Sequence, residues 1–425
     1  MLASFLPLIP VANNQWMSEP VVIASDCEGT GYACQRMVIH DGHYFFVFYS
    51  NVTYLVYRTS VNGVEWSTPT PIRPCADDKL FSIWYDETYA YYVYTPAELE
   101  EGIYYCRGVI SGNHIAWGTE YEARSGVADY SISKPVLVVN SDGLPFIGYT
   151  YYYNNGWEGT YSVWLSNCPN GDGSGIWTHT KLSSNFKYEL ITALAPLTKG
   201  KVYATYSVPQ SGPIYGKLFN GSWSAEEKVA PTSVVKTALS AVNLNDDVHI
   251  TFVYSDGLSR GIKYVKRTYE IGWSEEETIH SPVESIASLT LTVNSATDEM
   301  WCFFILKSTD RVVYLKFTNN QWDDSFRVLH DRTEEDMPVE PSASYLTYSD
   351  FIMLVWRENH GGTGAPNNLT FTYFKADSSL PVTPKKPFAL PILLIILGLS
   401  CIIAMVIIIQ KWKRTRASST RALKG

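Results

Sequence analysis

The chain has 425 residues, of which 33 are Lys or Arg and 42 are Asp or Glu, so that its net charge at pH 7 is −9. An acidic surface repels phosphate backbones, and we therefore expect no nucleic-acid partner. Aromatic residues make up 14% of the chain, and tyrosine alone supplies 30 residues. This composition suits the pleated, half-buried surfaces of strands and predicts an all-β fold.

The N-terminus, residues 1–12, is a short apolar stretch that begins without a basic residue. A secretory signal peptide normally has a positively charged start and a longer apolar core. We interpret this stretch as part of a truncated signal peptide. The alternative is that the apolar segment near the C-terminus directs the chain to the membrane.

A tryptophan returns about every 50 residues, a period typical of the strand repeats that form the blades of a β-propeller. Most copies follow a turn that contains Gly or Asn and precede a β-branched run. The repeated residues are Trp16, Trp66, Trp117, Trp177, Trp223, Trp273 and Trp322. These copies predict one propeller domain over residues 13–375.

Four strands can be recognised in the first full repeat, at residues 36–40, 44–49, 53–59 and 66–72. The dipeptide Asp41-Gly42 separates the first two, and Asp-Gly between two strand patterns is a strong hairpin signal. Each repeat is therefore expected to be a four-stranded antiparallel blade.

The two ends of the repeat region are incomplete. The chain begins with a lone fourth strand at residues 16–23 and finishes with three strands between residues 344 and 375. Pairing of residues 16–23 with residues 369–374 would complete a blade and leave only short, protected edges. The expected fold is a seven-bladed β-propeller of four-stranded blades, closed by an N-terminal strand and followed by one transmembrane helix.

The turn Ser60-Val61-Asn62-Gly63-Val64-Glu65-Trp66 resembles the Asp-box of sialidase-type (BNR) repeats, whose pattern is Ser-x-Asp-x-Gly-x-x-Trp. It is one residue shorter and has Asn in place of Asp, and the other copies keep little more than Gly or Asn and the Trp. The resemblance implies a propeller fold, not a function. We expect the tryptophans to pack between blades rather than to bind a ligand.

Sialidases with such repeats carry an Arg-Ile-Pro motif, three arginines that bind the substrate carboxylate, a Tyr–Glu nucleophile pair and an Asp acid/base. Arg36-Met37-Val38 matches only the arginine of that motif, so Arg36 is a weak catalytic candidate. Arg260 and Arg357 lie in loops of later blades and are candidate ligand-binding residues, because guanidinium groups suit carboxylates. The alternative is that each arginine pairs with a neighbouring acidic residue.

A second candidate site contains Tyr151, Tyr152, Tyr153, Trp157 and Glu158, which join the second and third strands of one blade. Flat aromatic rings stack on sugar rings while polar groups bind the hydroxyls. The alternative is that the tyrosines end a strand and are partly buried. The sequence has no zinc-type Cys/His spacing and no phosphate-binding loop, so we expect no metal and no cofactor.

The C-terminal region predicts a membrane anchor. Residues 388–410 are uncharged and long enough to cross a bilayer as a helix. The basic tail that follows, residues 411–425, is typical of the cytoplasmic side. Residues 376–387 contain Pro, Ser and Lys without an apolar period and are interpreted as a stalk. The predicted location is the plasma membrane, with the propeller outside.

The chain has seven cysteines, which permit disulfides in an extracellular domain. Cys27–Cys34 and Cys75–Cys106 are two candidate pairs, and buried thiols are the alternative, because pairing cannot be deduced from sequence.

These features predict a single-pass cell-surface propeller that binds an extracellular glycan or protein without catalysis. Two alternatives stay open: a sialidase-like glycoside hydrolase and a structural subunit of a cell-envelope assembly. Three arginines converging on one pocket beside a Tyr–Glu contact would favour the hydrolase. An aromatic surface without them would favour binding.

Overall fold

The computed structural model describes residues 18–29, 32, 34–51, 53–74, 81–96, 102–154, 159–208, 212–231, 235–255, 260–281, 286–331, 337–359 and 367–376. All of them belong to one compact unit, Met1–Asp377. No helix in this described part is long and apolar enough to cross a membrane. The predicted N-terminal stretch, transmembrane segment and cytoplasmic tail lie outside it.

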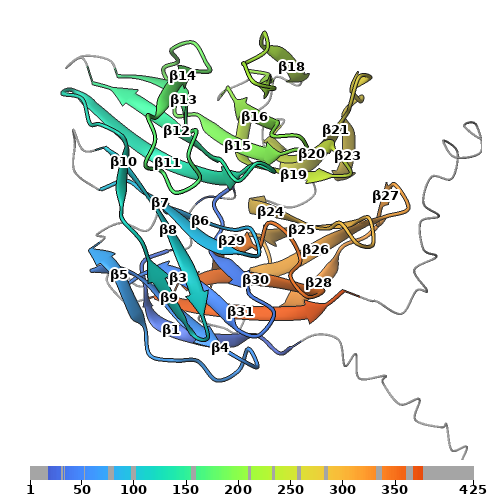
Figure 1. Cartoon of the computed structure of the whole chain (residues 1–425). Helices are drawn as coiled ribbons and strands as arrows, with labels where there is room; N and C mark the ends of the chain where they lie inside the picture. The colour runs from blue at the N-terminus through green and yellow to red at the C-terminus, as the bar shows by residue number, and fades with distance from the viewer. Residues whose placement is uncertain are drawn as a thin grey trace, which may run out of the picture. The chain divides into compact units, whose positions relative to one another are not determined.

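Seven antiparallel sheets form a ring of blades, one for each predicted repeat (Figure 1). In the first four blades the strands follow one another in chain order from the centre outward. Blade I contains β2 (Val38–His40), β3 (Phe45–Ser50), β4 (Tyr54–Ser60) and β5 (Thr70–Pro74). Blade II contains β6 (Phe81–Tyr85), β7 (Tyr89–Tyr94), β8 (Ile103–Ser111), and then β9 (His114–Trp117) and β10 (Tyr121–Arg124), which both pair with β8. Blade III contains β11 (Tyr130–Val139), β12 (Pro145–Tyr153), β13 (Thr160–Asn167) and β14 (Thr178–Lys181). Blade IV contains β15 (Ile191–Pro196), β16 (Val202–Ser207), β17 (Ile214–Phe219) and β18 (Glu227–Ala230).

The outermost strand is divided in two in blades V and VI, as it is in blade II. Blade V contains β19 (Val235–Leu244), β20 (Asp247–Ser255), β21 (Arg260–Thr268), β22 (Gly272–Trp273) and β23 (Glu277–His280). Blade VI contains β24 (Ile286–Asn294), β25 (Glu299–Leu306), β26 (Arg311–Thr318), β27 (Gln321–Trp322) and β28 (Arg327–His330). Blade VII contains β29 (Met337–Ala343), β30 (Phe351–Asn359), β31 (Asn367–Lys375) and β1 (Val21–Cys27). The predicted seven-bladed all-β propeller is confirmed.

The ring is closed by the first strand of the chain. β1 pairs antiparallel with β31, with Val21 opposite Phe371 and Cys27 opposite Asn367. The predicted long-range pairing is therefore confirmed, although the strand lies a few residues later than expected. Pro20 directly precedes it and has no N–H to donate to a ladder.

Four of the repeat tryptophans pack between blades, as predicted, whereas Trp117 and Trp223 contact Tyr92 and Phe219 of their own blades. In these four the indole lies edge-on against an aromatic ring of the preceding blade, with ring centroids 4.9–5.5 Å apart. These pairs are Trp66–Phe371, Trp177–Tyr105, Trp273–Tyr203 and Trp322–Tyr264. Edge-to-face pairs of this kind add about 0.5–1.5 kcal/mol beyond the buried area, so they help to join neighbouring blades.

The turn before Trp66 is held by its own side chains. Ser60 Oγ accepts a hydrogen bond from Gly63 N (2.9 Å), and Asn62 Oδ1 accepts one from Glu65 N (2.9 Å). The Trp66 Nε1–H donates to Gly63 O (3.1 Å). Gly63 has a φ of +71°, which most side chains disfavour.

A second turn has a related arrangement that the sequence did not single out. Asp172 Oδ1 accepts a hydrogen bond from Ser174 N (3.0 Å), and Trp177 Nε1 donates to Gly173 O (3.1 Å). The hydrogen bonds from Ser174 lower the pKa of Asp172. Asp172 thus occupies the position that Asn62 has in the first turn.

Both ends of the described chain lie on one face. Because the strands are antiparallel, the turns between first and second strands and the turns before the tryptophans share a face, which we call the lower face. Ser18 N donates to Tyr373 O (2.9 Å), and Ala376 N donates to Asp350 O (2.7 Å), both at this face. The loops between second and third strands, including the one after Tyr153, emerge on the opposite, upper face.

The described cysteines are buried, and no disulfide joins Cys27, Cys34, Cys106, Cys168 or Cys302 to another of them. The candidate pair Cys27–Cys34 is therefore not bonded. Cys75 lies outside the described residues.

Two buried histidines predict acid lability. His249 and His40 are 2% and 3% exposed, and burial lowers their pKa values to about 3 and about 4. The unfolded chain binds protons below its histidine pKa of about 6.5, whereas the native chain does not, so stability falls from pH 6.5 toward pH 3. Each histidine should lower the free energy of unfolding by about 2 kcal/mol when the pH falls from 7 to 5.

Urea unfolding followed by tryptophan fluorescence at pH 7 and pH 5 measures this loss. His249→Gln keeps a partner for the Tyr264 hydroxyl, which lies 2.7 Å from His249 Nδ1, and should shrink the loss between the two pH values. His43→Gln, at an exposed position, is the control and should leave it unchanged. If the His249→Gln chain loses as much stability between pH 7 and pH 5 as the unchanged chain, His249 is not a source of the acid lability.

Candidate functional site

Arg36 lies at the centre of the ring and is 4% exposed. Its guanidinium donates to Leu291 O (2.6 Å) and Thr290 Oγ1 (3.0 Å) of blade VI, Ala343 O (3.3 Å) of blade VII, and Ser240 Oγ (3.4 Å) of blade V. Burial lowers the pKa of Arg36 to about 10. In these contacts the guanidinium donates hydrogen bonds to uncharged oxygens of three blades, and it thereby links blades V, VI and VII.

The backbone beside Arg36 extends this tie. Arg36 N donates to Ser82 Oγ (3.4 Å) of blade II, and Gln35 Nε2 donates to Pro135 O (3.0 Å) of blade III. The ring of Tyr345 lies 5.3 Å from the Arg36 guanidinium. The centre of the propeller is therefore filled by side chains from several blades.

The other two predicted arginines have separate partners. Arg260 donates to Ile286 O (3.3 Å). Arg357 forms an ion pair with Glu340 (3.2 Å) and donates to Glu28 O. Within the described residues these contacts give Arg36, Arg260 and Arg357 different acceptors, and their assignment to a ligand stays a prediction.

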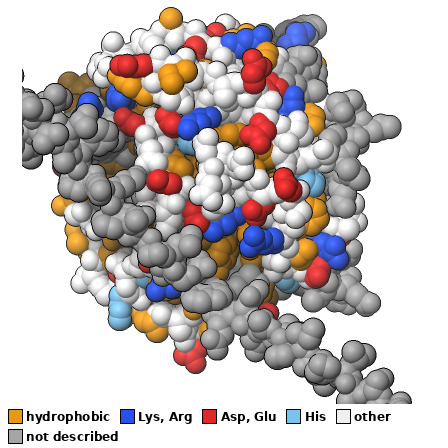
Figure 2. Space-filling model, turned by 90° about the vertical axis from the view of Figure 1, so that its right-hand side faces the viewer, with side chains coloured by type: hydrophobic (Ala, Val, Ile, Leu, Met, Phe, Trp, Pro, Cys, Tyr) orange, Lys and Arg blue, Asp and Glu red, His pale blue; other side chains and the backbone are white. Residues whose placement is uncertain are grey.

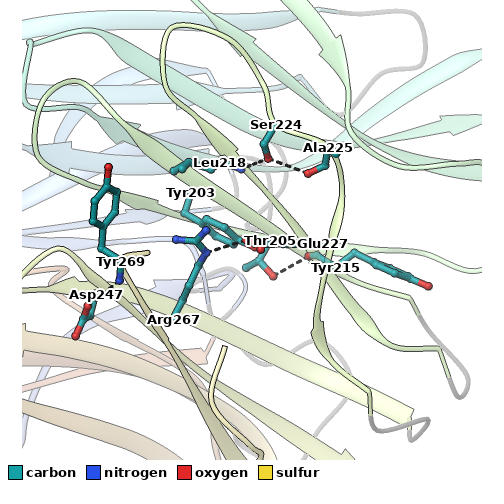
Figure 3. Close-up of polar contacts among 10 residues, drawn as sticks. All are labelled: Tyr203, Thr205, Tyr215, Leu218, Ser224, Ala225, Glu227, Asp247, Arg267 and Tyr269. Carbon is teal, nitrogen blue, oxygen red and sulfur yellow. Dashed lines mark hydrogen bonds and ion pairs between the residues drawn. The ribbon is translucent and has the colours of Figure 1, made fainter. Parts of the chain in front are cut away.

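A Tyr–Glu–Arg contact joins blades IV and V (Figure 3). The Tyr203 hydroxyl donates to Glu227 Oε1 (2.8 Å), and Arg267 Nε donates to the same oxygen (2.8 Å). Burial raises the pKa of Tyr203 well above its usual range, and the nearby Glu227 carboxylate adds to this effect. A phenol that keeps its proton is a hydrogen-bond donor and a poor nucleophile.

The same arrangement joins blades I and II. The Tyr92 hydroxyl and an Arg73 guanidinium nitrogen each donate to Glu120 Oε2 at 2.6 Å. Burial, then Cys106 and Glu120, raise the pKa of Tyr92 far above that of a free phenol. The sequence did not indicate either cluster, because their members come from strands of different blades. In both clusters a glutamate accepts hydrogen bonds from a tyrosine of its own blade and an arginine of the neighbouring blade, and so links the two blades.

The predicted tyrosines alternate between the two sides of blade III. Tyr151 is 5% exposed, and Tyr130 of β11 lies between Tyr151 and Tyr153 with ring centroids 4.6 Å from each. Tyr152 points to the other side and contacts Tyr161 (4.6 Å). Tyr152 and Tyr153 are half-buried and lie at the upper face. Trp157 and Glu158 lie outside the described residues.

The aromatic surface extends beyond the predicted residues. The Arg124 guanidinium of β10 lies 5.1 Å from the Trp164 ring and 5.6 Å from the Tyr151 ring. Tyr130 and Trp164 are half-buried. We call Tyr130, Tyr153 and Trp164, which lie on the same side of blade III as Tyr151, the upper aromatic surface. Tyr130 was missed because only strand pairing places it opposite Tyr153, and Arg124 was missed because it comes from β10 of the neighbouring blade II.

A groove of about 400 Å³ separates the outer strands of blades V and VI. We call it the V/VI groove. It is lined by Glu277, Thr278, Ile279, His280, Ser281, Leu315, Trp322, Asp323, Asp324, Ser325 and Phe326. Figure 2 views the side on which these blades lie and shows acidic and basic side chains interspersed with hydrophobic ones. In the described ranges, this groove included, no three His, Cys, Asp or Glu side chains gather as metal ligands.

No protein-family model and no curated protein sequence matches the chain. Its fold is similar to that of an oligogalacturonate lyase from Vibrio parahaemolyticus, with a TM-score of 0.55, 12% identity, and coverage of 85% of this chain and 94% of that one. It is also similar to the polysaccharide lyase Uly1 (TM-score 0.53, 9% identity, coverage 85% and 100%). The K499G mutant of the NanB sialidase from Streptococcus pneumoniae matches at a TM-score of 0.47 and 9% identity, over 81% and 86% of the two chains. At these identities the similarity shows the propeller fold alone.

Proposed function

We propose that the propeller binds a carbohydrate outside the cell without changing it chemically, and that the segment after Ala376 holds it to the membrane. The observation that carries this proposal is the upper aromatic surface, where half-buried rings lie at a blade end. Rings that are fixed by neighbours stack on a sugar at little entropic cost.

Two further observations favour binding over hydrolysis. The Arg36 guanidinium is buried among neutral oxygens, and the tyrosines of the Tyr203–Glu227, Tyr92–Glu120 and Tyr206–Glu226 contacts have raised pKa values. A sialidase mechanism needs an arginine that faces the substrate and a tyrosine that gives up its proton. Two of the structural neighbours are lyases of oligogalacturonate or polysaccharide, which supports a carbohydrate as the ligand class.

The position of the chain ends supports the same proposal. Ser18 and Ala376 both lie at the lower face, so a chain that continues from Ala376 leaves the propeller at the face opposite the upper aromatic surface. The upper aromatic surface would then be presented to ligands in the surrounding medium.

Cells that express the full chain should capture fluorescent glycopolymers from a panel of neutral and acidic glycans while the cells are intact. Tyr130→Ala and Tyr153→Ala should each weaken capture about fivefold, because one stack contributes about 1 kcal/mol. Tyr188→Ala is the matched control, since Tyr188 is exposed and outside the surface, and should leave capture unchanged.

Two results would contradict the proposal. One is the absence of capture for every glycan on intact cells, which would favour the envelope-subunit alternative. The other is steady release of fluorophore from a fluorogenic sialoside by the purified chain, which would favour the hydrolase.

A further inference from the structure

Arg124 lies against the upper aromatic surface, and its side chain has no hydrogen-bonding partner. Its guanidinium is 5.1 Å from the Trp164 ring and 5.6 Å from the Tyr151 ring. Within the described residues it forms no hydrogen bond and no ion pair. Its nitrogens are not buried, whereas Arg73 Nε is buried. The N–H groups of Arg124 are therefore open to a ligand from the solvent.

Two arginines at other blade boundaries also lie over tyrosine rings, and each of them has a carboxylate partner. Arg73 donates to Glu120 Oε2 at 2.6 Å. Arg267 donates to Glu227 Oε1 at 2.8 Å. Arg124 has the aromatic rings but no such carboxylate among the described residues, so its positive charge is left for water or for a ligand.

Arg107 of blade II is a useful comparison, because its guanidinium also lies over a ring, 4.3 Å from Tyr89. After the hydrogen bonds from Ser174, Arg107 adds to the lowering of the Asp172 pKa, so a carboxylate lies near it. Tyr89 begins β7, directly after a turn at the lower face. Arg107 therefore has an anionic neighbour of its own and lies toward the other face.

The Arg124 guanidinium continues a row of rings that reaches the upper face. The ring centroid of Tyr151 is 5.7 Å from that of Trp164 and 4.6 Å from that of Tyr130. Tyr130 in turn lies 4.6 Å from Tyr153. A sugar stacked on Tyr130 or Tyr153 therefore has a cation beside the next ring of the row.

The chemistry of a guanidinium selects the kind of sugar. Its N–H groups only donate, and their planar arrangement matches two oxygens of a carboxylate. A sugar hydroxyl offers one uncharged oxygen, and a hydrogen bond to a charged oxygen is about twice as strong. The ammonium group of an amino sugar cannot accept a hydrogen bond and is repelled. Arg124 thus favours a sugar that carries an anionic group.

We propose that the upper aromatic surface binds an acidic sugar, whose ring stacks on Tyr130 or Tyr153 and whose carboxylate or sulfate group binds Arg124. This ligand class rests on carbohydrate binding as the function of the chain and makes it more specific. The arginine that meets the ligand is then none of the three that the sequence indicated.

The test uses the full chain purified in a mild detergent and ligand-observed NMR titration. The probes are the methyl glycosides of galacturonate, glucuronate and N-acetylneuraminate, each as the free acid and as its methyl ester. Galactose 6-sulfate and galactose form a fourth pair, which distinguishes a sulfate from a carboxylate. In at least one pair the anion should bind about fivefold more tightly, a ratio typical of a solvent-exposed ion pair. Added salt should reduce this ratio.

Arg124→Gln should reduce the ratio toward one, and Arg124→Lys, which keeps the charge but not the planar group, should retain part of it. Arg107→Gln is the matched control and should leave the ratio unchanged. Tyr153→Ala should weaken the anion and its uncharged counterpart alike, because it removes a ring and no charge. The ratio compares two ligands on one protein, so a partial loss of folded chain does not change it.

A ratio near one for every pair in the unchanged chain would overturn the proposal, and so would a ratio that Arg124→Gln leaves intact. If the uncharged probes bind as well as the anions and respond to Tyr153→Ala, the acidic ligand class fails while the proposed function stands. If no probe binds but intact cells still capture glycopolymers, the ligand class again fails alone. Loss of both signals removes both.

Discussion

Replacing Arg36 with methionine is expected to lower the free energy of unfolding by about 3–5 kcal/mol, because hydrogen bonds to charged groups contribute about 1.5–3 kcal/mol each. Methionine fills much of the same volume but leaves Leu291 O and Ala343 O without their donor. Removing the charge also relieves the burial penalty that lowers the pKa of Arg36, and this relief offsets part of the loss. The remaining loss falls on contacts between blades V, VI and VII.

Urea unfolding measured by tryptophan fluorescence gives this difference. Arg327→Met is the control, because the Arg327 side chain is 60% exposed and should change stability by less than about 0.5 kcal/mol. A change below about 1 kcal/mol for Arg36→Met, together with loss of binding to an acidic glycan, would show that Arg36 serves a ligand rather than the ring.

Deleting residues 1–27 is expected to remove most of the cooperativity of unfolding. The deletion removes β1, exposes the edge of β31, and takes away the buried Ile23, Ala24 and Cys27 side chains. Burial of a large apolar side chain contributes about 1.5–3 kcal/mol and each ladder hydrogen bond about 0.5–1.5 kcal/mol. The total is on the order of 5 kcal/mol, which is comparable with the whole stability of an ordinary domain.

Two measurements separate ring closure from a general effect of truncation. A synthetic peptide of residues 18–29, added in excess, should bind the truncated chain and recover a single sharp unfolding transition. In the full chain, Ile23→Asp should be strongly destabilising because Ile23 is 5% exposed, whereas Val22→Asp, at 51% exposure on the same strand, should be nearly neutral. A truncated chain that unfolds as sharply as the full chain would show that the ring does not depend on β1.

The fold was predictable because its signals are local and repeated. The spacing of Trp66, Trp177, Trp273 and Trp322 follows from one packing contact used several times, and the incomplete ends require closure. Some strand bounds were displaced: β1 begins at Val21 instead of residue 16, β5 begins at Thr70 instead of residue 66, and β29 lies before residue 344. Pro20, which has no N–H to donate, directly precedes β1, and a repeat pattern does not show the effect of one such residue.

The candidate sites were less predictable because they depend on which way a side chain points. Arg36 matches a sialidase position in the sequence, but whether its guanidinium meets solvent or the inner strands is decided by contacts far away in the chain. Tyr151 and Tyr152 are neighbours in sequence and lie on opposite sides of their blade. The V/VI groove joins Glu277 to Asp323 across two blades, and no local pattern relates them.

The pairing of β31 with the closing strand β1 also has a mechanical consequence. β31 carries the chain toward Ala376, and it lies between β30 and β1, hydrogen-bonded to both. A pull on Ala376 directed away from the lower face acts along β31, so it loads both ladders in shear and strains their hydrogen bonds together rather than one at a time. A propeller tethered through Ala376 would resist a pulling force from a bound ligand at β31, the strand that pairs with β1 to close the ring.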